Sequence, residues 1–169
     1  MNNVSLGISL RSVKIVVVSA TPQTDWYCAL LTDEEGIQTV VEFSCGNNSK
    51  GVAQLIVDFV KENEGIRISS LSDLDGLLGT GKISDGRTDT AVMRSAIANG
   101  LIQIRSFKDQ MAVQKFLGGS GLNSIDLYAN INRSLFATDR SPVAFAEMAV
   151  HAADLGYTTI KCAPFDEVD

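Results

Sequence analysis

The C-terminal part of the chain constrains the fold most, because it reads strand, helix, strand. "SIDLYANI" and "YTTIKCAP" are rich in apolar and β-branched residues, and "SPVAFAEMAVHAADLG" lies between them with helical spacing. Ser141 suits the N-cap of this helix, Pro142 its first turn and Gly156 its end. Two strands joined by a helix run parallel, so we expect residues 125–131 and 157–163 to be parallel neighbours with a right-handed crossover.

The first part of the chain has a different pattern. "SVKIVVVSAT", "WYCALLT" and "IQTVVEFS" have strand composition and are separated by the turn-like "PQTD" and "DEEG", which predicts an antiparallel meander of three strands within residues 12–44. Apolar residues at helical spacing then predict helices over 51–62 and 90–110. Asp89 suits the start of the second helical region, and Gly118 with Gly119 its end.

Composition excludes several classes of partner. The 169 residues carry a formal net charge of -6 and no basic stripe, which argues against a nucleic-acid or anionic-membrane surface. The cysteines Cys28, Cys45 and Cys162 are odd in number and form no C-x-x-C pair, so we expect reduced thiols in the cytoplasm. No apolar run is long enough to span a bilayer.

Three isolated motifs carry little functional information. "GLLGTGKIS" places Gly76, Gly81 and Lys82 at phosphate-loop spacing, but Ile83 replaces the hydroxyl that would bind magnesium, so we interpret the segment as a surface loop. His151, the single histidine, falls on the polar flank of its helix and is expected to be solvated. The acidic runs "DEEG" and "DEVD" are expected to be exposed charge, and neither is a metal site by itself.

The combination "VEFS", "KFLGGSG", "IDLYANINR", "RSPVAFAEMAVHAADLGYTTIK" and "CAPFD", in this order, resembles the enolase superfamily, and within it the mandelate racemase and muconate lactonizing enzyme group. The resemblance covers nearly the whole chain and is strongest from Phe116 to Asp166. It implies an α+β capping domain, with a three-stranded antiparallel meander and helices, over residues 1–123. The first βαβ unit of a modified (β/α)-barrel would follow over residues 124–169. The helix that usually reads Ala-Leu-Trp-Asp in this group reads "GLIQI" here.

The resemblance also implies where a substrate would bind. Residues 21–26 match the capping-domain loop that closes over the substrate, residues 47–50 match a second and shorter loop, and "IDLYANI" matches the first barrel strand. The implied substrate-binding residues are Thr21, Asp25, Trp26, Asn48, Tyr128 and Asn130.

The end of the second barrel strand departs from the family pattern. Relatives carry a Lys-x-Lys pair there, and its second lysine moves the proton next to a carboxylate. Lys161 matches the first lysine, and Ala163 stands where the second would be. Because alanine has no proton to exchange, the resemblance implies that Lys161 polarises the substrate carboxylate while a base from another strand takes the proton. The alternative interpretation of Lys161 is a strand-end lysine that reaches solvent.

In the family, the complete enzyme uses Mg²⁺ held by carboxylates of the third, fourth and fifth barrel strands, and these ligands are not expected in this chain. A (β/α)-barrel needs eight strands and about 250 residues, so we expect the N-terminal part of a longer or split enzyme, inactive alone. Such enzymes racemise, dehydrate or cycloisomerise hydroxy acids, acid sugars or amino-acid derivatives.

The expected partners are a small carboxylate substrate and either a second copy or a companion chain that completes the barrel. The alternative function is a non-catalytic binding or assembly module built on the capping domain. Absent metal ligands and Ala163 favour this alternative, and acidic residues at the ends of downstream barrel strands would favour the enzyme.

Overall fold

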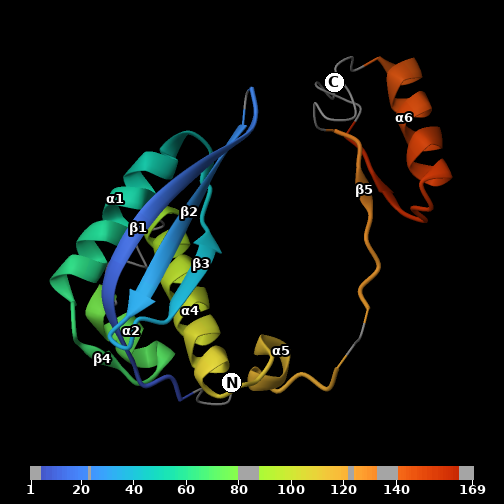
Figure 1. The fold of residues 1–169 in the computed structure, drawn as a ribbon. Helices are drawn as coiled ribbons and strands as arrows, with labels where there is room; N and C mark the ends of the chain where they lie inside the picture. The colour runs from blue at the N-terminus through green and yellow to red at the C-terminus, as the bar shows by residue number, and fades with distance from the viewer. Residues whose placement is uncertain (1–4, 23, 80–87, 122–123, 133–140, 164–169) are drawn as a thin grey trace. The chain divides into compact units, whose positions relative to one another are not determined.

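The computed structural model describes residues 5–22, 24–79, 88–121, 124–132 and 141–163 (Figure 1). The chain forms two compact units, Met1–Gly121 and Leu122–Asp169, which are described separately below. The assignment of a capping domain ending at residue 123 and a barrel segment starting at residue 124 remains a prediction.

Unit 1 contains one antiparallel sheet. Its strands are β1 (Ile8–Thr21), β2 (Thr24–Asp33), β3 (Gln38–Glu42) and the short β4 (Arg67–Ile68), in the order β3-β2-β1-β4. All three pairings are antiparallel. The predicted three-stranded meander is therefore confirmed, and β4 joins its edge through two residue pairs with β1.

One face of the sheet supplies the core of unit 1. In the register, Val13 lies opposite Leu31, Ile15 lies opposite Ala29, and Ala29 lies opposite Val41. Ala29, Leu31 and Val41 are buried, and Val13 and Ile15 pack against them. Since side chains alternate along a strand, this register places all five on the same face.

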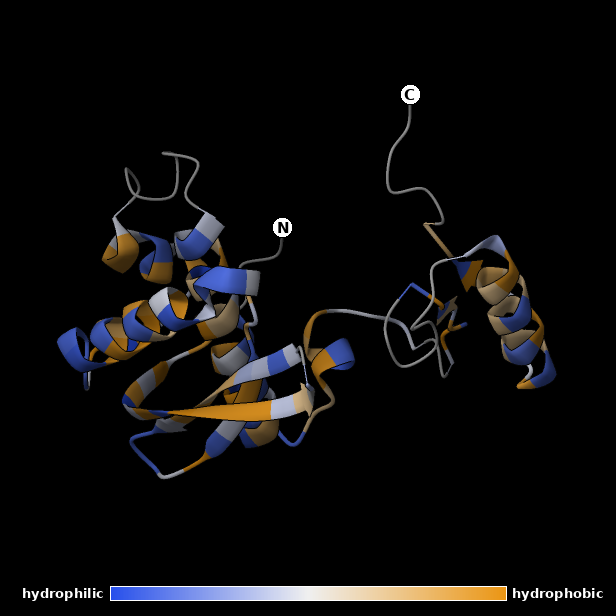
Figure 2. Cartoon of the chain, turned by 90° about the horizontal axis from the view of Figure 1, so that it is seen from above, coloured by the Kyte–Doolittle hydropathy of each residue, from blue (hydrophilic) through white to orange (hydrophobic). Residues whose placement is uncertain are grey.

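Helices cover that face (Figure 1). A short 3₁₀ helix, η1 (Gly46–Asn48), leads into α1, and the α-helices of unit 1 are α1 (Ser49–Glu62), α2 (Leu71–Leu78), α4 (Thr88–Lys108) and α5 (Val113–Phe116). Apolar and polar residues alternate around these helices, as Figure 2 shows. In α1 the buried positions Val52, Ile56, Phe59 and Val60 follow the predicted period, so the helices expected over 51–62 and 90–110 are confirmed within a few residues.

The sequence predicted that the helical region beginning near Asp89 ends at Gly118 and Gly119. This prediction is wrong, because α4 ends earlier. It stops at Lys108 because Gln110 adopts a positive φ of 52°, with Gln110 N–H donating to Phe107 O at 3.0 Å and Met111 N–H donating to Ser106 O at 2.9 Å. These two bonds form a Schellman C-cap, which usually has glycine at the residue with positive φ. Gly118, with φ 82°, closes the separate helix α5 in the same way.

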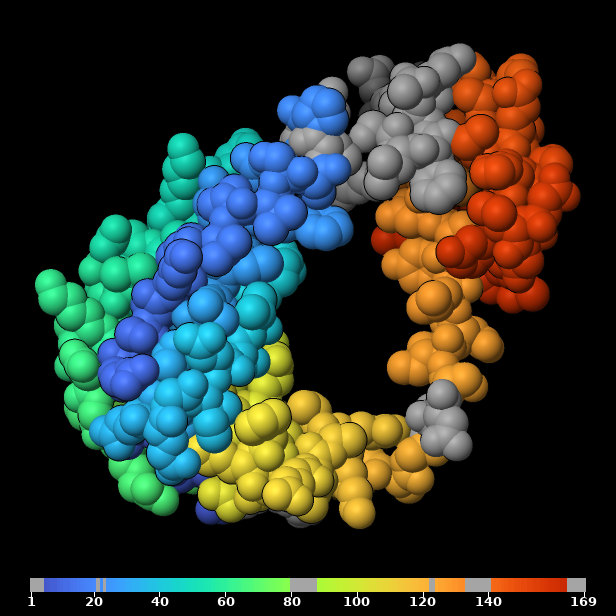
Figure 3. Space-filling view, viewed as in Figure 1, coloured from blue at the N-terminus to red at the C-terminus, as the bar shows by residue number. Residues whose placement is uncertain are grey.

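The other face of the hairpin between β1 and β2 is also apolar. Val16 and Val18 of β1 and Trp26 of β2 are 37%, 46% and 53% exposed, and Val18 pairs with Trp26. Figure 3 shows β1 and β2 running side by side along the surface of unit 1. The part of this hairpin near the turn between β1 and β2 therefore has exposed apolar side chains.

Unit 2 contains a parallel pair of strands and one helix. β5 (Ala129–Asn130) pairs with β6 (Ile160–Lys161), and α6 (Pro142–Asp154) lies between them in sequence. Ser141 caps α6 by accepting from Ala144 N–H at 3.2 Å, and Gly156 ends it with φ 91°. The parallel pairing is confirmed, but each strand is two residues long, shorter than the predicted ranges, because few backbone bonds join them.

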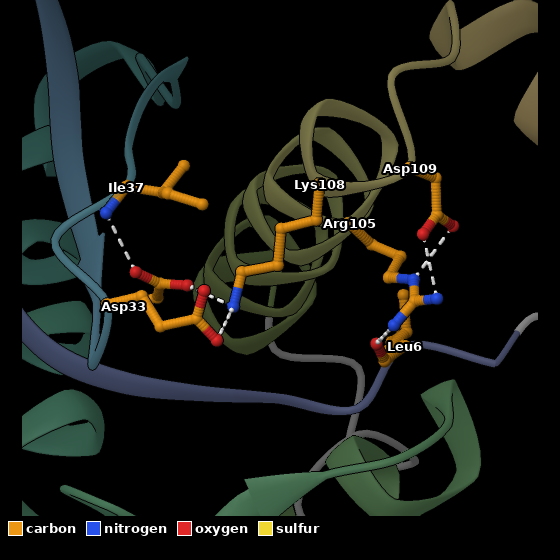
Figure 4. A network of polar contacts seen from close by, with 7 residues as sticks. Leu6, Asp33, Ile37, Arg105, Lys108 and Asp109 are labelled. Carbon is orange, nitrogen blue, oxygen red and sulfur yellow. Dashed lines mark hydrogen bonds and ion pairs between the residues drawn. The ribbon is translucent and has the colours of Figure 1, made fainter.

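A partly buried ion pair fixes the end of α4 to the turn between β2 and β3 (Figure 4). Lys108 Nζ lies 2.7 Å from Asp33 Oδ2 and 2.9 Å from Glu35 Oε1. The Asp33 side chain is 1% exposed, so the expectation that "DEEG" is exposed charge is wrong at its first residue. Asp33 Oδ1 accepts from Ile37 N–H at 2.8 Å. Burial by itself lowers the pKa of Lys108, but the hydrogen bonds to Asp33 and Glu35 outweigh it and raise the pKa.

Replacing Lys108 by Met should lower the free energy of unfolding by about 2–4 kcal/mol, since the buried Asp33 carboxylate loses its cation. The pKa of Lys108 is raised in the folded state, so its stabilising effect is full below the unfolded lysine pKa of about 10.4 and disappears as pH rises through the folded value. Urea denaturation from pH 7 to 11.5 measures this difference.

Lys61→Met is the matched control, because Lys61 is exposed in the last turn of α1. Adding Asp33→Asn to Lys108→Met should recover part of the loss, because a neutral amide costs less to bury than an unpaired carboxylate. Equal stabilities of the wild type and Lys108→Met at pH 7 would contradict this account.

Gly100 lets α4 approach the sheet closely. A Cβ at this position would lie 2.3 Å from Leu31 Cδ1 and 3.5 Å from Thr39 Cγ2, and Leu31 is fully buried. Glycine costs an α-helix about 1 kcal/mol relative to alanine, so its presence inside α4 is explained by this contact.

Gly100→Ala should therefore destabilise the chain by about 1–2 kcal/mol, since overpacking of the buried core exceeds the gain in helix propensity. Gly76→Ala is the matched control: Gly76 lies inside α2, and an added Cβ there meets nothing within 4 Å. That variant should be neutral or slightly stabilising. Thermal denaturation followed by circular dichroism checks both, and stabilisation by Gly100→Ala would contradict the packing argument.

Candidate functional site

Three of the predicted residues lie together at the ends of the parallel strands of unit 2. Asn130 ends β5 and pairs with Lys161, which ends β6. Lys161 Nζ lies 5.8 Å from the ring centroid of Tyr128, within cation–π range. Lys161 and Tyr128 are exposed and Asn130 is half-buried. This arrangement presents a cation, an aromatic ring and an amide to a ligand.

Asn132 was not predicted from the sequence, yet it is bonded to both strand ends. Its Nδ2 donates to Asn130 Oδ1 at 2.9 Å and to Lys161 O at 3.4 Å. Its Oδ1 accepts from Ala163 N–H. The only sequence signal is an asparagine two residues after another at a strand end, a pattern too common to single out.

Ala163 lies two residues beyond Lys161 and is exposed. Its methyl group has no exchangeable proton, so the described end of β6 offers two titratable side chains, the ammonium group of Lys161 and the thiol of Cys162. The local chemistry is that of binding and polarising an anion.

The residues of unit 1 that the resemblance assigns to substrate binding are described in part. Gln23 and the side chain of Thr21 lie outside the described residues. Asp25 is exposed and accepts from Ser19 Oγ at 2.8 Å across the hairpin. Trp26, the next residue, is 53% exposed. Asp25 and Trp26 are therefore available at the far end of the β1–β2 hairpin.

Asn48 is bonded within unit 1 to a different element. It ends η1 and is exposed, and its Nδ2 donates to Asp89 Oδ2 at the start of α4. The prediction of Asp89 as the N-cap is wrong, because α4 begins at Thr88 and Asp89 lies in its first turn. Its carboxylate bonds the Asn48 side chain at the start of α1. Use of Asn48 for a ligand would compete with this hydrogen bond.

The remaining sequence motifs form no site among the described residues. Gly76 lies inside α2 and not in the expected surface loop, while Gly81, Lys82 and Ile83 lie outside the described residues. α2 starts at Leu71 because Ser70 and Asp73 form a capping box. His151 is exposed on α6, as the polar flank indicated.

No group of three or more His, Cys, Asp or Glu side chains that could hold a metal ion occurs in the described part of the chain. The described residues therefore offer no site that fits magnesium. Within the same described ranges, no helix is long and apolar enough to cross a membrane.

An ion pair between Arg94 and Asp75 joins α4 to α2 in unit 1. Arg94 Nε lies 2.5 Å from Asp75 Oδ1 and Nη2 lies 2.9 Å from Oδ2. This hydrogen-bonded pair lowers the pKa of Asp75 and raises that of Arg94. Each side chain is about one third exposed, so solvent screens the pair and its contribution to stability is small.

No protein-family model and no curated protein matches the chain. Solved structures do. An enolase from the environmental genome shotgun sequencing of the Sargasso Sea has a TM-score of 0.82 and 20% identity, over 98% of this chain and 45% of that chain. A mandelate racemase/muconate lactonizing enzyme from Sulfitobacter sp has a TM-score of 0.72 and 19% identity, over 93% of this chain and 42% of that chain.

A third structure, described as an L-alanine-DL-glutamate epimerase from Burkholderia xenovorans strain LB400, is bound to magnesium and fumarate. Its TM-score is 0.76 at 18% identity, over 90% of this chain and 40% of that chain. The chain thus spans less than half the length of each of these structures. Its fold, an α+β capping domain followed by a parallel βαβ unit, is the one found in enolase-superfamily structures of the mandelate racemase/muconate lactonizing enzyme type.

Proposed function

We propose that the chain supplies the capping domain and first βαβ unit of a mandelate racemase/muconate lactonizing-like enzyme that removes the proton α to a carboxylate. The observation that carries the proposal is Lys161 at the C-terminal end of β6, beside Asn130 at the end of β5. Ligands of (β/α)-barrels bind at this end of the strands.

In this proposal Lys161 binds the substrate carboxylate. Its ammonium group offsets the negative charge that develops on the carboxylate when the α-proton leaves. Because this charge is greater in the transition state than in the bound substrate, the contact lowers the activation barrier. Asn130 and Tyr128 orient the same ligand. A base from outside the described residues takes the proton, because Ala163 cannot.

The capping domain has a separate role. Asp25 and Trp26, with Thr21, would cover the bound substrate from the end of the β1–β2 hairpin, and Asn48 would contribute if its bond to Asp89 opened. Covering the substrate excludes water and strengthens each polar contact beneath.

Magnesium would be supplied with the rest of the barrel in the complete enzyme. The magnesium- and fumarate-bound relative supports this, together with a small carboxylate as ligand. Residues 1–169 alone should bind Mg²⁺ no better than an ordinary acidic surface, since a hard cation needs several oxygen ligands at one point. Isothermal calorimetry with MgCl₂ measures this, and tight binding of one ion per chain would overturn it.

Further strands are also what unit 2 needs. Ile125 and Leu127 are 78% and 70% exposed beside β5, and parallel strands are normally covered on both faces. We propose that a companion polypeptide or a downstream segment completes the barrel, and that the assembled protein is cytoplasmic. The downstream coding sequence is the first place to look for it. The three cysteines are unpaired, which suits a reducing compartment.

In the protein assembled with that barrel portion, Lys161→Ala should lower the rate of α-proton exchange about a hundredfold or more, because one preorganised charge contact is lost. Exchange into carboxylate substrates in deuterated water is followed by NMR. Lys115→Ala, at an exposed lysine of α5, is the control and should leave the rate unchanged.

The non-catalytic alternative gives a different result. An assembly module would form a stable complex with its partner but show no exchange with any hydroxy acid, acid sugar or amino-acid derivative. Full exchange by Lys161→Ala would instead leave the enzyme proposal standing and remove Lys161 from it.

A further inference from the structure

The side-chain amide of Asn132 bonds to both strands of unit 2 at once. Nδ2 donates to Asn130 Oδ1 at 2.9 Å and to Lys161 O at 3.4 Å, while Oδ1 accepts from Ala163 N–H. The backbone N–H of Asn132 also donates to Asn130 Oδ1, at 3.2 Å. Asparagine suits this position because its planar amide has two donors and an acceptor.

These bonds extend the parallel ladder beyond its backbone pairs. Ala129 N–H donates to Thr159 O at 2.9 Å, and Ile131 N–H donates to Lys161 O at 3.1 Å. In a regular parallel ladder the next bond would run from Ala163 N–H to the carbonyl of Ile131. Here Ala163 N–H donates to Asn132 Oδ1. A side-chain carbonyl thus takes the part of a backbone carbonyl at the next step.

We propose that Asn132 is a positioning residue for Lys161. By holding both the carbonyl of Lys161 and the N–H of Ala163, it fixes the backbone on either side of Cys162 and the direction in which the Lys161 side chain leaves β6. Asn130 in turn holds the Asn132 amide in place. A strand of two residues has little other pairing to orient its last side chain.

The consequence for function rests on the proposed role of Lys161. A charged group aids a reaction only when it is held within a fraction of an ångström of its productive position, and bonds from a second residue provide this. Asn132 would therefore act through Lys161 and not by touching the substrate.

The test uses residues 1–169 in three forms: wild type, Asn132→Ala and Asn132→Asp. Amide hydrogen exchange by NMR is measured at Ala163, with Ala129 and Ile131 as internal references. The ε-methylene shifts of Lys161, which sense the Tyr128 ring, report the direction of its side chain. His151→Ala, at an exposed residue of α6, is the matched control.

We expect exchange at Ala163 to rise about fivefold to tenfold in Asn132→Ala, with a change of the Lys161 shifts and unchanged exchange at Ala129 and Ile131. Asn132→Asp keeps an acceptor for Ala163 N–H and should retain its protection. Three results would overturn the proposal: equal exchange at Ala163 in wild type and Asn132→Ala, unchanged Lys161 shifts, or loss of protection throughout unit 2 in both variants.

Failure of this inference is distinguishable from failure of the proposed function. The exchange and shift measurements need neither substrate nor barrel partner. Absence of α-proton exchange in an assembled protein whose Ala163 amide is protected would overturn the enzyme proposal and leave the role of Asn132 in orienting Lys161 intact.

Discussion

Close packing of α4 against one face of the antiparallel sheet is the contact on which unit 1 depends. Leu31 sits in the gap that Gly100 leaves, Thr39 Oγ1 donates to Gln103 Oε1 at 2.6 Å a turn further along, and Lys108 binds Asp33 at the helix end. Apolar contact, a neutral hydrogen bond and an ion pair thus follow one another along the same helix. These three contacts fix both the distance of α4 from the sheet and its position along the helix axis. The end of the β1–β2 hairpin opposite its turn is therefore held against α4.

The sequence predicted the parts of this fold that repeat. Alternating side chains in the strands and a 3.6-residue period in α1 identify which face is buried, because burial of apolar surface depends on the pattern more than on any one residue. The end of α4 at Lys108 could not be predicted in this way. The C-cap after Lys108 places a positive φ at Gln110, where the sequence has no glycine to signal it, and the nearby ion pair of Lys108 with Asp33 forms only in the folded unit.

The candidate site was predictable to a similar degree. Resemblance to a family placed Lys161 at the end of one strand and Tyr128 and Asn130 in the strand before it. The parallel register pairs Asn130 with Lys161, and the Lys161 ammonium group lies over the Tyr128 ring. The resemblance did not reveal that Asn48 is bonded to Asp89, nor that Asn132 bridges β5 and β6. Both depend on side chains meeting across elements, and neither residue type nor spacing in the sequence encodes such a meeting.

A lysine at residue 161 followed by an alanine at residue 163 limits how protons can be transferred under the proposed function. Racemisation removes a proton from one face of the α-carbon and returns one to the opposite face, so it needs a proton-transfer group on each side. With alanine at residue 163, one position that could hold such a group cannot transfer a proton. Dehydration and cycloisomerisation need one base and a leaving or ring-closing group. Under the proposed function each of these reactions therefore takes its base from another strand, with Lys161 left to bind charge.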